Sequence, residues 1–284
     1  MIPRYARHVR LVARVMSRYP FLGVRDWFPI PWLKVLLIVK YMRNWTRHLL
    51  SQMRILFPPR SWPAPVHAKA RIVHLPWGSA SLMDVPMKPM RERTRNYFFS
   101  GGIALGSTSG YRRFLSTPKI LARESPVRAV EKFEQKHPEL APAQSVKVHT
   151  DKGTGDLADM DAYSERLIDT RVCLAPRGSV ADTWRFFEGL KSGCAVITNL
   201  LPDEWYYRNA PVIQLESWDA LEDFLLPLLA DESRLDAMQK QSLLYWETVC
   251  GEKALGRFLA VDNPEERGGM IVCSRFISSA FFQP

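Results

Sequence analysis

The stretch 163–199 (YSERLIDTRVCLAPRGSVADTWRFFEGLKSGCAVITN) constrains the fold of this chain more than any other part. It predicts a helix, a short apolar strand, a polar turn at 177–179, an amphipathic helix at 182–191, and a second apolar strand, AVITN. The run VCLAP, which ends at a proline, is typical of a buried parallel strand. The dipeptide SerGly at 192–193 is expected to end the second helix. The pattern therefore indicates a βαβ unit of minimal length.

The turn of this unit is the expected ligand site, because open α/β sheets bind ligands beyond the carboxyl ends of their strands. Arg177 and Gly178 lie there, directly before a helix whose first N–H groups attract anions. Glycine also lets the backbone come close to a ligand. Arg185 and Glu188, three residues apart, share a face of that helix, and the carboxylate suits a ribose diol better than a phosphate. The alternative is an ordinary βαβ unit with a solvated Arg–Glu pair.

The segment PRGSVADTWRFFEGLKSGCAVI resembles the nucleotide-sugar motif of exostosin-like glycosyltransferases, and the resemblance extends over residues 96–259. The matching positions are Pro176, Arg177, Gly178, Thr183, Arg185, Phe187, Glu188, Gly193 and Cys194. The family implies a GT-B fold, with two Rossmann-like domains and the donor bound mainly by the C-terminal one. It also implies that Glu188 binds the ribose, that Arg177 and Arg185 bind the diphosphate, and that Gly178 and Thr183 belong to the same donor site.

The function implied by the resemblance is transfer of a sugar from a nucleoside diphosphate sugar to a glycan or other hydroxyl acceptor. The family inverts configuration, so a base on the acceptor side is required, and the sequence assigns no residue to it. No cofactor is expected. The acids of 151–161 (DKGTGDLADMD) lack the calcium-loop pattern, so we assign no metal. Residues 1–95 offer a single clear strand, 71–76, where the family's N-terminal domain has several, which indicates a shortened member.

A second candidate for the donor site follows the segment NYFFSGG, which predicts the first strand of the donor domain at 96–102. The Gly/Ser/Thr-rich loop after it contains Gly101 and Gly102 at its start and Arg112 and Arg113 at its end. Loop amides and one of the arginines would reach a donor phosphate. The alternative is a flexible surface loop. Residues 117–137 predict a helix with a break at Pro126.

The positive charge is concentrated at the N-terminus. Residues 1–60 contain 12 Lys/Arg and one acidic residue, whereas the remainder contains 27 basic and 28 acidic residues. A neutral folded body argues against a nucleic-acid-binding protein. Residues 1–60 predict a largely helical, basic and aromatic-rich segment that suits an anionic membrane surface. The alternative is a helical segment whose arginines only face water.

The four cysteines are scattered and lack zinc-ligand spacing, and Cys173 and Cys194 fall in predicted core strands. We expect buried thiols in a reducing compartment. The N-terminus has no signal-peptide pattern and no apolar run long enough to span a bilayer. The expected location is cytoplasmic, with peripheral membrane attachment as an addition.

The C-terminal part predicts three amphipathic helices, with caps at Ser217, Asp231 and Gly251. The aromatic run 205–207 (WYY) suits core packing, with stacking on a base or sugar as the alternative. The expected organisation is a basic segment at 1–60, a linker and part of an acceptor-side domain at 61–95, a Rossmann-like domain at 96–260 and a tail at 261–284. In the third part, the order of strands and helices predicts a parallel sheet with helices on both faces.

Two other classes of function stay open. One is a non-catalytic protein that binds a nucleotide sugar, with the donor site kept and the base lost. The other is a membrane-surface scaffold that acts through residues 1–60.

Overall fold

The structure is a computed structural model whose contacts divide the chain into two units, each described here by itself. The larger unit consists mainly of residues 76–259, and the smaller includes residues 1–17, 27–75 and 260–284. The described residues are 11–15, 46, 50, 71–79, 86–102, 110–141, 146–149, 157–178, 183–261 and 272–274.

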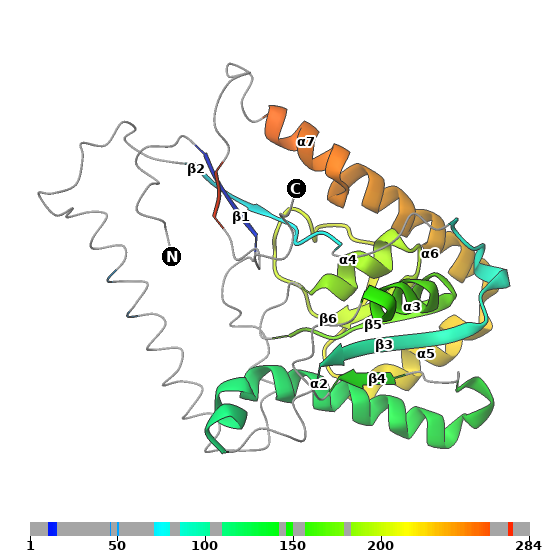
Figure 1. The fold of residues 1–284 in the computed structure, drawn as a ribbon. Helices are drawn as coiled ribbons and strands as arrows, with labels where there is room; N and C mark the ends of the chain where they lie inside the picture. The colour runs from blue at the N-terminus through cyan, green and yellow to red at the C-terminus, as the bar shows by residue number, and fades with distance from the viewer. Residues whose placement is uncertain are drawn as a thin grey trace, which may run out of the picture. The chain divides into compact units, whose positions relative to one another are not determined.

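The larger unit is built on a five-stranded sheet with the order β4-β3-β5-β6-β7, in which every neighbouring pair is parallel (Figure 1). The strands are β3 (Arg95–Gly102), β4 (Val146–His149), β5 (Thr170–Ala175), β6 (Ala195–Asn199) and β7 (Val212–Leu215). The helices are α2 (Gly110–Lys136), α3 (Leu157–Ile168), α4 (Trp184–Lys191), α5 (Leu221–Ala230), α6 (Glu232–Tyr245) and α7 (Glu252–Val261). The predicted βαβ unit is confirmed as β5, α4 and β6.

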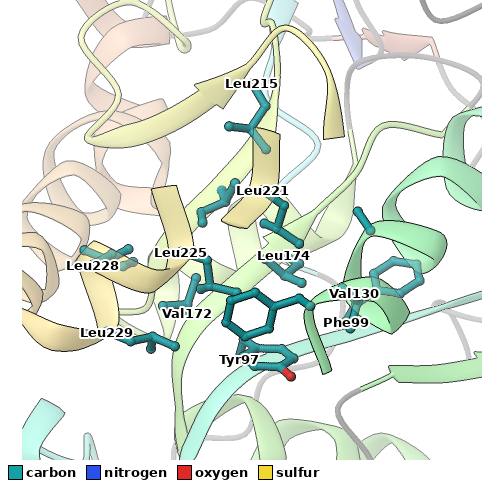
Figure 2. Close-up of a cluster of buried hydrophobic side chains, with 14 of the residues drawn as sticks. Tyr97, Phe99, Val130, Val172, Leu174, Leu215, Leu221, Leu225, Leu228 and Leu229 are labelled. Atoms are coloured by element: carbon teal, nitrogen blue, oxygen red, sulfur yellow. The ribbon is translucent and has the colours of Figure 1, made fainter. Parts of the chain in front are cut away.

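Helices cover both faces of this sheet, because successive side chains of a strand point to opposite faces. On β3, Tyr97 and Phe99 pack with α2 and α5, whereas Phe98 between them packs on the face of α3 and α4. Figure 2 shows the first of these two cores, with strand residues Val172 and Leu174 opposite leucines of α5. The prediction of a parallel sheet between two helical layers, in a Rossmann-like domain, is confirmed.

Helix α4 begins and ends where its sequence predicts. The Thr183 hydroxyl accepts a hydrogen bond from the Phe186 amide at 3.4 Å, which is an N-cap. After Ser192 the chain turns through Gly193, whose φ of +61° is favourable for glycine. Inside the helix, a Cβ on Gly189 would lie 2.9 Å from the Val196 side chain, so glycine sets the close approach of α4 to the sheet.

Other helix ends and core positions also agree with the sequence. The Ser217 hydroxyl accepts from the Asp219 amide, and the Asp231 carboxylate accepts from the Arg234 amide at 2.9 Å. Cys173 and Cys194 are buried thiols, as predicted. Tyr206 and Tyr207 lie in the core of the α3/α4 face, so the packing interpretation of the aromatic run is confirmed for these two rings.

The predicted break at Pro126 is wrong. Helix α2 continues from Gly110 to Lys136 through this proline. Proline in a helix interior removes one backbone hydrogen bond. The ring of Pro126 is buried, and Ala129 and Val130 in the next turn belong to the core, so tertiary packing opposes this local cost.

The part of the larger unit before β3 is packed rather than open. By sequence, residues 61–95 were assigned to a linker and part of an acceptor-side domain, but Met90 is 2% exposed in the core beside Leu235 and Met238 of α6. A short 3-10 turn, Met90–Glu92, places it there. By contacts, residues 76–95 therefore belong with the sheet domain.

The smaller unit contains a three-stranded parallel sheet with the order β2-β1-β8. Its strands are β1 (Leu11–Val15), β2 (Arg71–Leu75) and β8 (Val272–Ser274). The predicted strand at 71–76 is confirmed as β2. At Leu11–Val15 the structure has a strand where the sequence predicted helix, and the β-branched Val12 and Val15 favour that outcome. Apart from β1 and the two helical residues Thr46 and Leu50, segment 1–60 lies outside the described residues.

Among the helices that the structure describes, none combines the length and the apolar character needed to cross a bilayer.

Candidate functional site

At the carboxyl edge of the sheet, hydrogen bonds between the ends of β5 and β6 fix the start of the predicted turn. The Arg177 amide, just after β5, donates to the Asn199 side-chain oxygen at the end of β6, at 3.0 Å. Just before these two residues, the Thr198 hydroxyl of β6 donates to the carbonyl of Ala175, the last residue of β5, at 2.8 Å. The Arg177 side chain is 6% exposed. Two neighbouring parallel strands therefore fix the backbone that carries Arg177 and Gly178.

An arginine that the sequence did not indicate reaches this edge from α2. Arg123 is 5% exposed, and its guanidinium lies between two glycines of the predicted site. A Cβ on Gly101 of β3 would lie 3.2 Å from Arg123 Nη1, and one on Gly178 would lie 3.7 Å from Nη2. The absence of side chains at these two glycines makes room for the guanidinium. In the sequence, Arg123 is one of several charged residues on a long helix, with no motif around it.

Arg185, in the first turn of α4, lies at the same edge. Its Nε donates to the Ser100 carbonyl of β3, and its guanidinium carbon lies 5.8 Å from the Phe99 ring centroid. Burial, followed by the positive charge of Arg185, lowers the pKa of the Arg123 guanidinium to about 9. The Arg123 guanidinium thus keeps its charge at neutral pH, and the neighbouring Arg185 repels it at this buried position. An anion bound there would relieve this repulsion.

Glu188 is buried one turn further along α4 and is 3% exposed. The phenol of Tyr163, on α3, donates to Glu188 Oε2 at 2.6 Å. Burial, and next the charge of Glu188, raise the pKa of the Tyr163 phenol well above its ordinary value, so the phenol keeps its proton at neutral pH. Tyr163 is the second residue that sequence reasoning missed, since its spacing within a predicted helix marked it only as part of that helix.

The structure thus brings part of the predicted donor site together. Gly101, Gly178 and Arg185 surround Arg123, while Glu188 lies on the same helix as Arg185. Thr183 acts as the N-cap of α4.

The predicted phosphate loop is placed only at its ends. Gly102 is the last residue of β3 and pairs with His149 of β4. Arg112 and Arg113 lie in the first turn of α2, and their side chains, like loop residues 103–109, lie outside the described part of the structure. Their contact with a donor phosphate stays a prediction.

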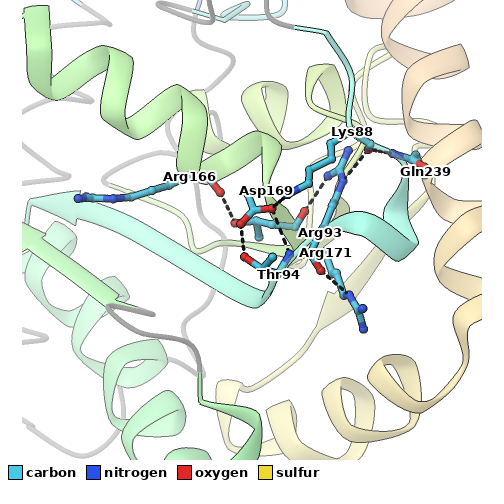
Figure 3. Close-up of polar contacts among 8 residues, drawn as sticks. Lys88, Arg93, Thr94, Arg166, Asp169, Arg171 and Gln239 are labelled. Carbon is cyan, nitrogen blue, oxygen red and sulfur yellow. Dashed lines mark hydrogen bonds and ion pairs between the residues drawn. The ribbon is translucent and has the colours of Figure 1, made fainter.

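A second polar cluster lies at the opposite, amino-terminal edge of the sheet (Figure 3). Arg93 is 1% exposed, and its guanidinium donates to the backbone carbonyls of Lys88, Thr170 and Ser192. Beside it, the Asp169 carboxylate accepts from the Lys88 ammonium and from Thr94. These contacts join the starts of β3, β5 and β6, so we interpret the cluster as structural.

Among the residues that the structure describes, no group of three or more His, Cys, Asp or Glu side chains is arranged to hold a metal ion. Within the described ranges, the charged groups of the candidate site are its arginines and Glu188.

Comparison with known proteins gives little. No family model matches the chain, and no curated protein matches it. One solved structure that is similar is a sucrose-phosphate synthase from Thermosynechococcus elongatus, with 12% sequence identity and a TM-score of 0.34. The match covers 92% of this chain and 48% of that protein, so the chain spans about half its length. We base no argument on this similarity.

Proposed function

We propose that this chain is a glycosyltransferase of GT-B type that binds a nucleoside diphosphate sugar at the carboxyl edge of its parallel sheet. The observation that supports it most is that the Arg123 guanidinium lies between Gly101 and Gly178, next to the turn's Arg177 and beside the charge of Arg185. Glu188 lies one turn further along α4, so positive charge for a diphosphate and a carboxylate for a ribose lie close together.

In this proposal the arginines bind the diphosphate. Guanidinium groups form paired hydrogen bonds to phosphate oxygens, which makes arginine well suited to such a ligand. Sugar transfer leaves a nucleoside diphosphate that gains negative charge as the bond to the sugar breaks. Fixed positive groups next to it lower the barrier to that step. We therefore propose that transfer needs no added metal ion.

Glu188 would bind the ribose of the nucleoside. Its carboxylate would accept hydrogen bonds from the ribose hydroxyls, and each carboxylate oxygen has room for more than one donor. The eight-residue helix α4 adds its N-terminal dipole behind Gly178, on the phosphate side. The acceptor would be a glycan or another hydroxyl compound, deprotonated by a base on the acceptor side.

The proposal is tested by calorimetric titration of UDP, GDP, ADP and CDP into the full chain and into Arg123→Ala, Arg185→Ala and Glu188→Ala. A hydrogen bond to a charged group contributes about 1.5–3 kcal/mol, so each variant should bind about 10- to 150-fold more weakly. Arg128→Ala is the matched control, since Arg128 is an exposed arginine on the same helix as Arg123. Circular dichroism of each variant checks its fold.

Equal binding by the folded variants and the wild type, or no binding of any of the four nucleotides, would refute the donor site. Release of nucleoside diphosphate from its sugar conjugate, dependent on an added hydroxyl acceptor, then tests catalysis. Donor binding without such release identifies a non-catalytic nucleotide-sugar-binding protein instead.

A further inference from the structure

We propose that Tyr163 is a positioning residue that holds the Glu188 carboxylate for recognition of the ribose hydroxyls, so that the site selects ribonucleotides. This inference rests on the proposed function. The inference adds that the selectivity of the site for ribose depends on a hydrogen bond between two helices.

The geometry places Tyr163 between the sheet and Glu188. Its ring lies against Phe98 of β3, with centroids 6.0 Å apart, and its hydroxyl reaches Glu188 Oε2 at 2.6 Å. The contact joins α3 to α4 on one face of the sheet. The ring contact with Phe98 gives the phenol a fixed support from which its hydroxyl can hold the carboxylate.

The chemistry of the pair suits this role. A terminal carboxylate rotates over a broad range of χ3 angles unless a partner holds it. The Tyr163 phenol is a permanent donor at neutral pH, because burial and the charge of Glu188 raise its pKa. One oxygen of Glu188 is thereby fixed, and with it the plane in which the carboxylate meets a ligand.

A site that forms hydrogen bonds to a ligand hydroxyl discriminates strongly against the analogue that lacks it, because its polar group is then left unpaired. A carboxylate that is free to rotate loses part of this discrimination. Removing the phenol hydroxyl of Tyr163 should therefore weaken the binding of ribonucleotides more than the binding of their deoxy analogues. If the role of Tyr163 were purely structural, its loss would weaken the binding of both to the same extent.

The experiment compares UDP, GDP, ADP and CDP with their 2′,3′-dideoxy analogues by calorimetry, on the wild type and on Tyr163→Phe. We expect the wild type to prefer the ribonucleotide. One hydrogen bond contributes about 0.5–1.5 kcal/mol, so Tyr163→Phe should reduce this preference by about 2- to 13-fold, with the affinity for the dideoxy analogue nearly unchanged.

Tyr97→Phe is the matched control. Tyr97 is another buried tyrosine whose hydroxyl donates to a glutamate, Glu134, at 3.1 Å, but it lies on the other face of the sheet. Its loss should leave the ribose preference unchanged.

The double variant Tyr163→Phe/Glu188→Gln shows whether Tyr163 acts through Glu188. It also serves if Tyr163→Phe does not fold because the buried Glu188 charge has lost the phenol. The double variant should have the ribose preference of Glu188→Gln alone, because the effects of two residues in one contact do not add.

Two outcomes overturn the inference while leaving the donor site in place: an unchanged ribose preference in Tyr163→Phe, or an additive further loss in the double variant. Failure of the wild type to bind any of the nucleotides overturns the proposed function, and this inference with it.

Discussion

Arg93→Met removes the charge that joins the amino ends of three strands while keeping an unbranched side chain of similar length. In the wild type, the Arg93 Nε donates to the Lys88 carbonyl at 3.1 Å. Nη1 donates to Thr170 and Nη2 donates to Ser192, both at 2.7 Å. These three acceptors are backbone carbonyls, so no substitution elsewhere can remove them. Figure 3 shows Arg93 beside Lys88, Thr94 and Asp169.

The size of the effect follows from these acceptors. Replacing both members of a buried polar pair by apolar groups is often nearly neutral, but here only the donor can be replaced. A buried acceptor without a partner costs about 1–3 kcal/mol. Part of the total cost is offset, because the variant no longer has to desolvate a guanidinium. The Lys88 carbonyl keeps the Gln239 side-chain amide as a donor, so two carbonyls lose their charged donor. We expect a net loss of about 2–4 kcal/mol.

The assay is urea unfolding followed by tryptophan fluorescence, for which the chain has nine tryptophans. Arg91→Met is the control, since Arg91 is exposed on the adjacent 3-10 turn and should change the unfolding free energy by less than about 0.5 kcal/mol. A loss below about 1 kcal/mol in Arg93→Met would show that the three contacts contribute no net stability, and would refute the reasoning.

Three further predictions use the same unfolding assay. Thr183→Ala removes the N-cap of α4 and should cost about 1 kcal/mol; an unchanged unfolding free energy would contradict the cap. Gly101→Ala introduces a Cβ that would lie 2.8 Å from the Phe99 ring, so the ring or the Arg123 guanidinium must move. It should cost about 1–3 kcal/mol and also weaken nucleotide binding. For Asp169, burial favours the neutral form, but hydrogen bonds from Lys88 and Thr94 outweigh it and hold the pKa of the carboxyl below its ordinary value. Its stabilising effect is therefore present above the ordinary pKa, about 3.9, and is lost as pH falls below it. The wild type should lose stability there more steeply than Asp169→Asn, and parallel pH profiles would contradict the assignment.

The βαβ unit could be predicted from sequence because its signals are local. The apolar runs of β5 and β6 and the turn at Gly193 each depend on residues within one turn or strand. The caps at Ser217 and Asp231 were found in the same way, since a capping side chain binds an amide two or three residues away. The N-cap at Thr183 was not predicted, since sequence assigned this residue to the donor site.

Local reasoning failed where burial outweighs propensity. Pro126 lacks the amide that a helix interior uses, yet α2 continues through it, because the next turn packs into the core. At Leu11–Val15, arginines at helical spacing predicted a helix, and pairing with β2 and β8 gives a strand. In both cases the deciding contacts come from residues distant in sequence.

The sequence by itself determined where a turn with Arg177 and Gly178 and a carboxylate in the following helix would lie, since both follow from spacing along one βαβ unit. Only the tertiary structure decided which other side chains meet them. Arg123 comes from α2 and Tyr163 from α3, and each reaches the edge through the packing of its helix on the sheet. The register of a helix over a sheet is set by the whole core, so no short stretch of sequence encodes it.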